Sequence, residues 1–134
     1  MFQIGRERVE MSGKSGYLLD SNFIIRLSRS EVGAVEFFEK FDKVAVSIIT
    51  YMEVLGYNFK NVIESNMVRD IFELMEILYI DEVIANKVID IRKSIKIKLP
   101  DAIIAATALV NDYSLVTANI DDFKRLDELN IIND

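Results

Sequence analysis

The sequence predicts an α/β fold, in which a mostly parallel sheet is covered by helices on both faces. Short apolar runs that end in polar turns indicate buried strands, and they alternate along the chain with longer segments of helical periodicity. One helical segment, residues 101–110, is apolar on every side, as expected for a helix buried against such a sheet. With one proline, five glycines and no low-complexity linker in 134 residues, we expect one compact domain.

Each predicted strand is an apolar run of a few residues. The first covers residues 17–20, where three apolar residues precede Asp20 and a polar turn. The same pattern predicts the other strands at residues 44–47, 76–80, 114–117 and 130–132.

The predicted helices lie between these strands. In residues 81–98, the apolar residues from Ile84 to Ile95 are spaced four, three and four apart, which places them in one stripe on a helix. The all-apolar segment 101–110 is the last predicted helix. The earlier predicted helices cover residues 31–41, 48–57 and 61–75.

Residues 1–16 carry charges but no apolar core of a signal peptide, so we expect a cytoplasmic protein. No apolar run is long enough to cross a membrane, and we expect no membrane partner. Because Met11 offers an alternative start, residues 1–16 are interpreted as an N-terminal extension, either mobile or foreign to the natural sequence. The folded domain is then expected over residues 17–134.

The amino-acid composition narrows the possible chemistry. Neither cysteine nor histidine occurs, which excludes disulfides, Ser-His-Asp or Cys-His catalysis, and zinc sites built on these residues. Oxygen ligands remain, and they suit Mg²⁺ or Mn²⁺. A net charge of −6 disfavours non-specific binding of nucleic acid, so any such contact requires a local basic patch.

Asp20, Glu53 and Asp101 each stand as the only charge in an otherwise uncharged, mostly apolar stretch. Burying an isolated carboxylate costs several kcal/mol or forces it to take a proton. We therefore expect the three to share one buried acidic pocket that requires a cation. Asn119 and Asp122 follow a later predicted strand, and the carboxyl ends of parallel strands are where ligand sites form, so they are expected at the same edge.

Several of these acids also have purely structural interpretations. Asp20 could cap the next helix, and the negative charge of Asp101 could interact favourably with the dipole at a helix N-terminus. Asp121 and Asp122 could be solvated loop acids. No local feature explains Glu53, which favours a functional role for it.

A cluster of such acids can hold one or two divalent ions, which activate water and stabilise charge on a phosphate. The expected chemistry is phosphodiester hydrolysis. Four hydroxyls are candidates to orient the ligands or waters, although local capping by any of them is equally compatible with the sequence. They belong to Ser21, Ser47, Thr50 and Thr117.

Four segments carry these residues in a recognisable order: YLLDSNFI at 17–24, SIITYMEVLGY at 47–57, LPDAIIAATAL at 99–109 and LVTANIDDF at 115–123. In this order and spacing they resemble the PIN-domain ribonucleases, most closely the VapC-type toxins of type II toxin–antitoxin systems. The resemblance spans nearly the whole chain. It implies a three-layer α/β/α sandwich with a central, mostly parallel sheet.

The resemblance also implies Mg²⁺- or Mn²⁺-dependent endoribonuclease activity. By position, it implies Asp20, Glu53 and Asp101 as an acidic triad, with Asp122 as a further catalytic acid. The same residues and Asn119 would be the metal ligands. Asn119 is neutral where many relatives have Asp, which leaves open whether one or two ions bind.

RNA that approaches an acidic pocket needs positive charge nearby. Cations follow Asp20 and precede Asp101, and phosphate contact and a solvated helix face are both compatible with them. The candidate RNA-binding residues are Arg26, Arg92, Lys93, Lys96 and Lys98, with Arg29 close to the first. Nothing in the sequence encodes base readout.

The resemblance further implies a homodimer and a cognate antitoxin, whose arginine could pair with the carboxylates and displace the metal. Phe37, Phe38 and Phe41 are candidates for an antitoxin groove, unless they belong to the core.

Two other functions stay open. The neutral Asn119 permits a catalytically weakened PIN-like domain that only binds RNA or protein. A phosphorylated receiver domain also clusters acids at strand ends, but Lys124 matches its lysine only loosely and Glu53 would have no role there.

Overall fold

A sheet of five parallel strands lies at the centre of residues 14–133, the part of the chain that the computed structural model describes. The strand order is β3-β2-β1-β4-β5, and every adjacent pair is parallel. The strands are β1 (Gly16–Leu19), β2 (Val44–Ser47), β3 (Glu76–Leu78), β4 (Tyr113–Val116) and β5 (Ile131–Ile132). The predicted strands are therefore confirmed, with ends displaced by one or two residues. Most of the expected N-terminal extension, residues 1–13, lies outside the described residues.

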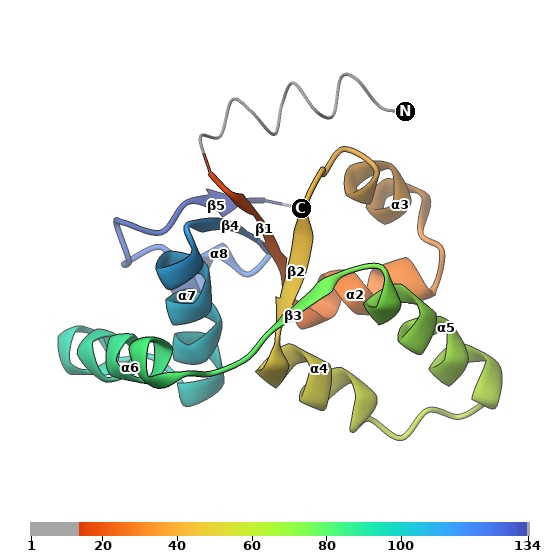
Figure 1. The fold of residues 1–134 in the computed structure, drawn as a ribbon. Helices are drawn as coiled ribbons and strands as arrows, with labels where there is room; N and C mark the ends of the chain where they lie inside the picture. Colours follow the sequence, from red (N-terminus) through yellow and green to blue (C-terminus); the bar gives the residue numbers. More distant parts are fainter. Residues whose placement is uncertain (1–13, 134) are drawn as a thin grey trace.

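Helices cover both faces of this sheet, which confirms the predicted three-layer architecture. Figure 1 shows α6 and α7 on one side of the strands and α2, α3 and α5 on the other. The helices are α2 (Ser21–Ser28), α3 (Val32–Phe38), α4 (Ile48–Leu55), α5 (Val62–Glu73), α6 (Glu82–Ser94), α7 (Leu99–Asn111) and α8 (Ile120–Phe123). Among the described residues, no helix is long and apolar enough to cross a membrane.

The central strand β1 supplies both hydrophobic cores. Because successive side chains of a strand point to opposite faces, Leu18 packs into the core beneath α6 and α7, whereas Tyr17 and Leu19 pack into the core beneath α2, α3 and α5. All four residues of β1 are buried. A strand buried on both faces reads as a continuous apolar run, which is why periodicity of two is not visible in the sequence.

The helix that carries Asp101 is buried as predicted, but it begins two residues earlier, at Leu99. Pro100 lies in its first turn, where the missing N–H costs no hydrogen bond. The helix predicted at 81–98 ends at Ser94, because Ile95 is extended. Residues 95–98 are instead a short connection that leads the chain from α6 into α7.

Two helices, α2 and α8, lack a predicted counterpart. Helix α2 is separated from β1 by one residue, where the sequence predicted a polar turn. Helix α8 is a single turn, and it contains the acids interpreted above as loop residues.

The phenylalanines proposed for an antitoxin groove pack largely into the core. Phe41 is buried and stacks on Tyr17, with ring centroids 4.4 Å apart. Phe37 lies edge-on to Phe41 at 5.1 Å, and Phe38 is partly buried against the same cluster. Their packing explains their apolar character without a partner protein.

Candidate active site

Asp20 lies at the carboxyl end of the central strand β1 and is only 8% exposed. Its Oδ1 accepts a hydrogen bond from the backbone N–H of Phe23 at 2.9 Å, so Asp20 caps α2. Its Oδ2 accepts a hydrogen bond from the hydroxyl of Thr117 at 2.5 Å. Thr117 is fully buried and follows β4, the neighbour of β1 in the sheet. The capping and site interpretations of Asp20 are thus compatible, since each uses a different carboxylate oxygen.

Glu53 differs from the expectation of a buried carboxylate, because its side chain is exposed. The flanking residues Thr50 and Val54 are buried, so the apolar stretch reflects the inner side of α4 and Glu53 lies on its outer side. The hydroxyl of Ser21, at the start of α2, donates a hydrogen bond to Glu53 Oε1 at 3.2 Å. This bond connects the helix after β1 with the helix after β2.

Asp101 lies in the first turn of α7 and is partly buried. Burial raises the pKa of its carboxyl group, and the negative charges of Asp122 and Glu53 raise it further, against the opposing effect of Lys98. The carboxylates of Glu53 on α4 and Asp122 on α8 therefore act electrostatically on that of Asp101 on α7.

Asn119 and Asp122 form a local pair around α8. Asn119 is the residue before the helix, and its side-chain amide donates a hydrogen bond to Asp122 Oδ2. The backbone N–H of Asn119 donates to Thr117 Oγ1 at 2.9 Å, which ties this pair to Asp20 through one hydroxyl. Asp121 instead forms an exposed ion pair with Lys124 at 3.1 Å.

The other two candidate hydroxyls have different surroundings. Ser47 caps α4, because its Oγ accepts a hydrogen bond from the backbone N–H of Ile49 at 3.1 Å. Thr50 is fully buried, and its hydroxyl has no hydrogen-bond partner within the described part of the chain.

Two cavities open beside these acids. The first, here called the basic cavity, has a volume of about 460 Å³ and contains Asp101 and Asp122. Its cations are Arg92, Lys96, Lys98 and Arg125. The second, the aromatic cavity, has a volume of about 370 Å³ and contains Ser21 and Glu53. Its remaining lining residues are Ile25, Arg29, Val54, Tyr57, Phe59 and Glu64.

The structure separates the candidate RNA-binding cations. Arg92 donates from Nε to the carbonyl oxygen of Ile97 at 3.3 Å, and Arg125 donates from Nη2 to that of Lys96 at 2.7 Å. Two arginines thus hold the connection between α6 and α7 by hydrogen bonds to its backbone, at the wall of the basic cavity. Lys93 does not line this cavity, and Arg26 pairs with Glu31 at 3.1 Å.

Arg125 is a site residue that the sequence did not single out. It lies two residues after the segment at 115–123, within a mixed-charge stretch that is typical of a solvated surface. Its closeness to the predicted acid Asp122 in the chain is the one signal that could have identified it.

The donor set fits a hard divalent cation. Across residues 14–133, no three acidic side chains are already arranged to enclose an ion. Glu53 and Asp122 are exposed, however, and exposed side chains change rotamer readily. The donors are all oxygens. Burial is the main cause of the raised pKa of Asp101, and a bound cation would relieve the repulsion from Asp122 and Glu53 that adds to it.

Comparisons with known proteins agree with this geometry. The PIN domain family model matches residues 17–129. The chain is similar to "Ribonuclease VapC1" of Rickettsia felis, with 30% identity over 129 residues, 87% of this chain and 95% of the relative. "Ribonuclease VapC" of Rickettsia bellii is 27% identical over the same shares. A chain in the solved "Toxin-antitoxin complex from Klebsiella pneumoniae" is 32% identical with a TM-score of 0.75, over 87% of this chain and 95% of that one.

Proposed function

The chain belongs to the PIN-domain family as a ribonuclease of the VapC type, and we propose that Asp20, Glu53, Asp101 and Asp122 are its catalytic acids. Its function is that of a toxin endoribonuclease that hydrolyses RNA phosphodiester bonds. We assign the catalytic domain to residues 17–134, with residues 1–16 as an extension, and we place its action in the cytoplasm.

The observation that carries the site assignment is the convergence of acids from four separate segments. Asp101 interacts electrostatically with Glu53 and Asp122, although these residues lie on three different helices. Asp20 joins them through Thr117 and Asn119, which connect it to the Asp122 segment by hydrogen bonds. Like charges repel, so a fold that gathers them at one sheet edge favours a cation-binding role over a structural one.

We propose Mg²⁺ or Mn²⁺ as the cofactor, held by oxygens of Asp20, Glu53, Asp101, Asn119 and Asp122. When bound there, such an ion supplies an activated water and stabilises charge on the phosphate. The protein's own contribution is orientation: Thr117 fixes the carboxylate of Asp20, and Ser21 holds that of Glu53.

The basic cavity is the proposed route of the RNA backbone to the carboxylates. Lys96, Lys98 and Arg125 lie in the same cavity as Asp101 and Asp122, so they can attract phosphates toward the acids. The overall charge of −6 makes such a local patch necessary. We therefore place RNA contact at Arg92, Lys96, Lys98 and Arg125, and we give Arg26 and Lys93 no part in it.

A VapC-type toxin has a cognate antitoxin as its protein partner. We propose that an antitoxin arginine reaches the carboxylates and competes with the metal, since a guanidinium pairs with carboxylates through two hydrogen bonds. We also propose a homodimer, which light scattering on the purified chain would test by its mass.

Cleavage of RNA by the antitoxin-free protein tests the proposed function. We expect fragments with Mg²⁺ or Mn²⁺, none in EDTA, and loss of cleavage in Asp20→Asn and Asp101→Asn. A broad panel of RNAs is needed, because narrow specificity imitates inactivity. Undiminished cleavage in both variants would refute the site. Metal-independent RNA binding without cleavage of any RNA would instead favour the non-catalytic binding module that Asn119 permits.

A further inference from the structure

We propose that the aromatic cavity beside Glu53 receives one base of the RNA substrate, stacked on Tyr57 and held next to the bond that is cut. The inference rests on the proposed function, which supplies RNA as the substrate. It assigns a base-binding role to Tyr57 and Phe59, which the sequence did not single out.

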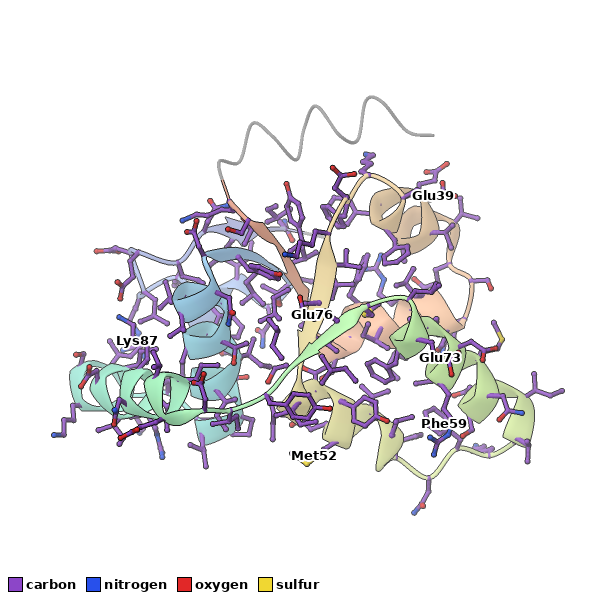
Figure 2. All side chains as sticks on the ribbon, viewed as in Figure 1. Glu39, Met52, Phe59, Glu73, Glu76 and Lys87 are labelled. Carbon is purple, nitrogen blue, oxygen red and sulfur yellow. The ribbon has the colours of Figure 1, made fainter. Side chains whose placement is uncertain are left out.

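The two aromatic rings stand directly beyond the helix that carries Glu53. Tyr57 lies two residues beyond the end of α4 and lines the same cavity as Glu53. Its backbone N–H donates to the carbonyl oxygen of Val54 at 3.3 Å, which closes a turn at the end of the helix. The rings of Tyr57 and Phe59 are 5.3 Å apart in an edge-to-face arrangement. Figure 2 shows Phe59 on the connection between α4 and α5.

The exposure of Tyr57 indicates that its ring is available to a ligand. Tyr57 is 62% exposed, whereas Phe59 is partly buried and packs against the core behind it. Every base has a face that can stack on an aromatic ring, so such a site accepts single-stranded RNA without strict readout of sequence. The volume of about 370 Å³ is in the range of small-ligand sites and exceeds what the stacking of one base requires.

Charged groups at the cavity suit a nucleotide. Arg29 lines the cavity and forms no ion pair with any of the residues that the structure describes, which leaves its guanidinium available to a phosphate. Glu64 is partly buried in the same wall and offers an acceptor to the amino group of a base. Arg29 and the ring of Tyr57 together match the phosphate and the base of one nucleotide.

The position of the cavity identifies RNA as the occupant. The proposed catalytic acids are divided between the two cavities: Asp101 and Asp122 lie in the basic cavity, and Glu53 lies in the aromatic cavity. A strand that places its scissile phosphate at these acids therefore extends into both. Its backbone meets cations on one side, and on the other side its next base meets Tyr57.

Fluorescence provides a direct test, because the chain contains no tryptophan. Tyr57→Trp in an Asp101→Asn background places one indole in the cavity of a protein that does not cleave. We expect its emission to be quenched on titration with single-stranded RNA. The matched control is Tyr79→Trp in the same background, since Tyr79 is 66% exposed and lines neither cavity. Equal quenching at both positions, or none at Tyr57→Trp when RNA binds, would overturn the inference.

Kinetics provide a second readout that separates this inference from the proposed function. Tyr57→Ala should raise KM for single-stranded RNA about 10- to 100-fold with little change in kcat, while Tyr57→Phe keeps the ring and most of the affinity. Tyr79→Ala should match the parent protein. If the parent cleaves RNA and Tyr57→Ala has the same KM, the proposed function stands and the base site is refuted. An unchanged KM combined with weakened antitoxin binding would assign the cavity to the antitoxin instead.

Discussion

Replacing Thr117 by valine removes two hydrogen bonds at the end of β4 while nearly conserving the side-chain volume. The hydroxyl donates to the carboxylate of Asp20 at 2.5 Å and accepts from the backbone N–H of Asn119 at 2.9 Å. A bond to a charged group contributes about 1.5–3 kcal/mol and a neutral one about 0.5–1.5 kcal/mol. Because Thr117 is fully buried, water cannot replace either bond without repacking. We expect Thr117→Val to lower the free energy of unfolding by about 2–4 kcal/mol.

Thr107→Val is the matched control. Thr107 is also fully buried, but its hydroxyl donates to the carbonyl oxygen of Ile103 in its own helix, at 2.7 Å. Such a bond within a helix adds little to stability, so we expect a loss below about 1 kcal/mol. Both variants are measured by urea unfolding at neutral pH, where a loss of about 3 kcal/mol lowers the midpoint by about 1–3 M.

Equal losses in the two variants would refute the reasoning, because the burial and the volume change are the same and only the partners of the hydroxyl differ. RNA cleavage gives an independent reading of the same contact. Thr117→Val should lose activity under conditions in which it is still folded, since Oδ2 of Asp20 then loses the hydrogen bond that orients it. Thr107→Val should cleave like the parent protein.

Three further outcomes follow from the described contacts. Thr50→Val should raise the free energy of unfolding by about 1 kcal/mol in urea titrations, because it removes a buried hydroxyl that lacks a partner in residues 14–133. The pKa of Asp101 is raised, so the folded protein holds the proton of this carboxyl group more tightly than the unfolded chain does. The contribution of the carboxyl group to stability therefore falls as pH rises from the ordinary carboxyl range through the folded pKa. Asp101→Asn should therefore gain stability relative to the parent as pH rises above the ordinary carboxyl range, and a stability difference that does not change with pH would contradict the shift. Arg125→Ala should raise KM for RNA several-fold, whereas Lys93→Ala, outside the basic cavity, should leave it unchanged.

The fold could be predicted well from the sequence because the signals for it are local. Apolar runs mark the strands, and the spacing from Ile84 to Ile95 marks α6. The errors concern helix ends and short helices, because a single hydrogen bond or dihedral angle determines where such a helix begins or ends. Ile95 ends α6 by becoming extended, although it continues the apolar stripe of the helix.

The site could be predicted only in part. The proposed acids were selected because each is the only charge in an otherwise uncharged stretch. The burial expected for them applies to Asp20 and fails for Glu53, because α4 is apolar only on its inner side. The sequence did not predict that Arg125 and Tyr57 line the two cavities, because a cation in a charged stretch and an aromatic residue after a helix are both ordinary surface features. Their significance comes from tertiary neighbours, which periodicity does not report.

The hydrogen bond between Asp20 and Thr117 joins residues 97 positions apart in the chain, and β1 acquires its β4 neighbour over the same separation. During synthesis, the proposed catalytic aspartate is therefore made early, but its carboxylate cannot form this bond until Thr117 has also left the ribosome. Such distant pairing also slows folding. The proposed site is therefore assembled only after the segments that carry Asp20 and Thr117 have both been synthesised and paired.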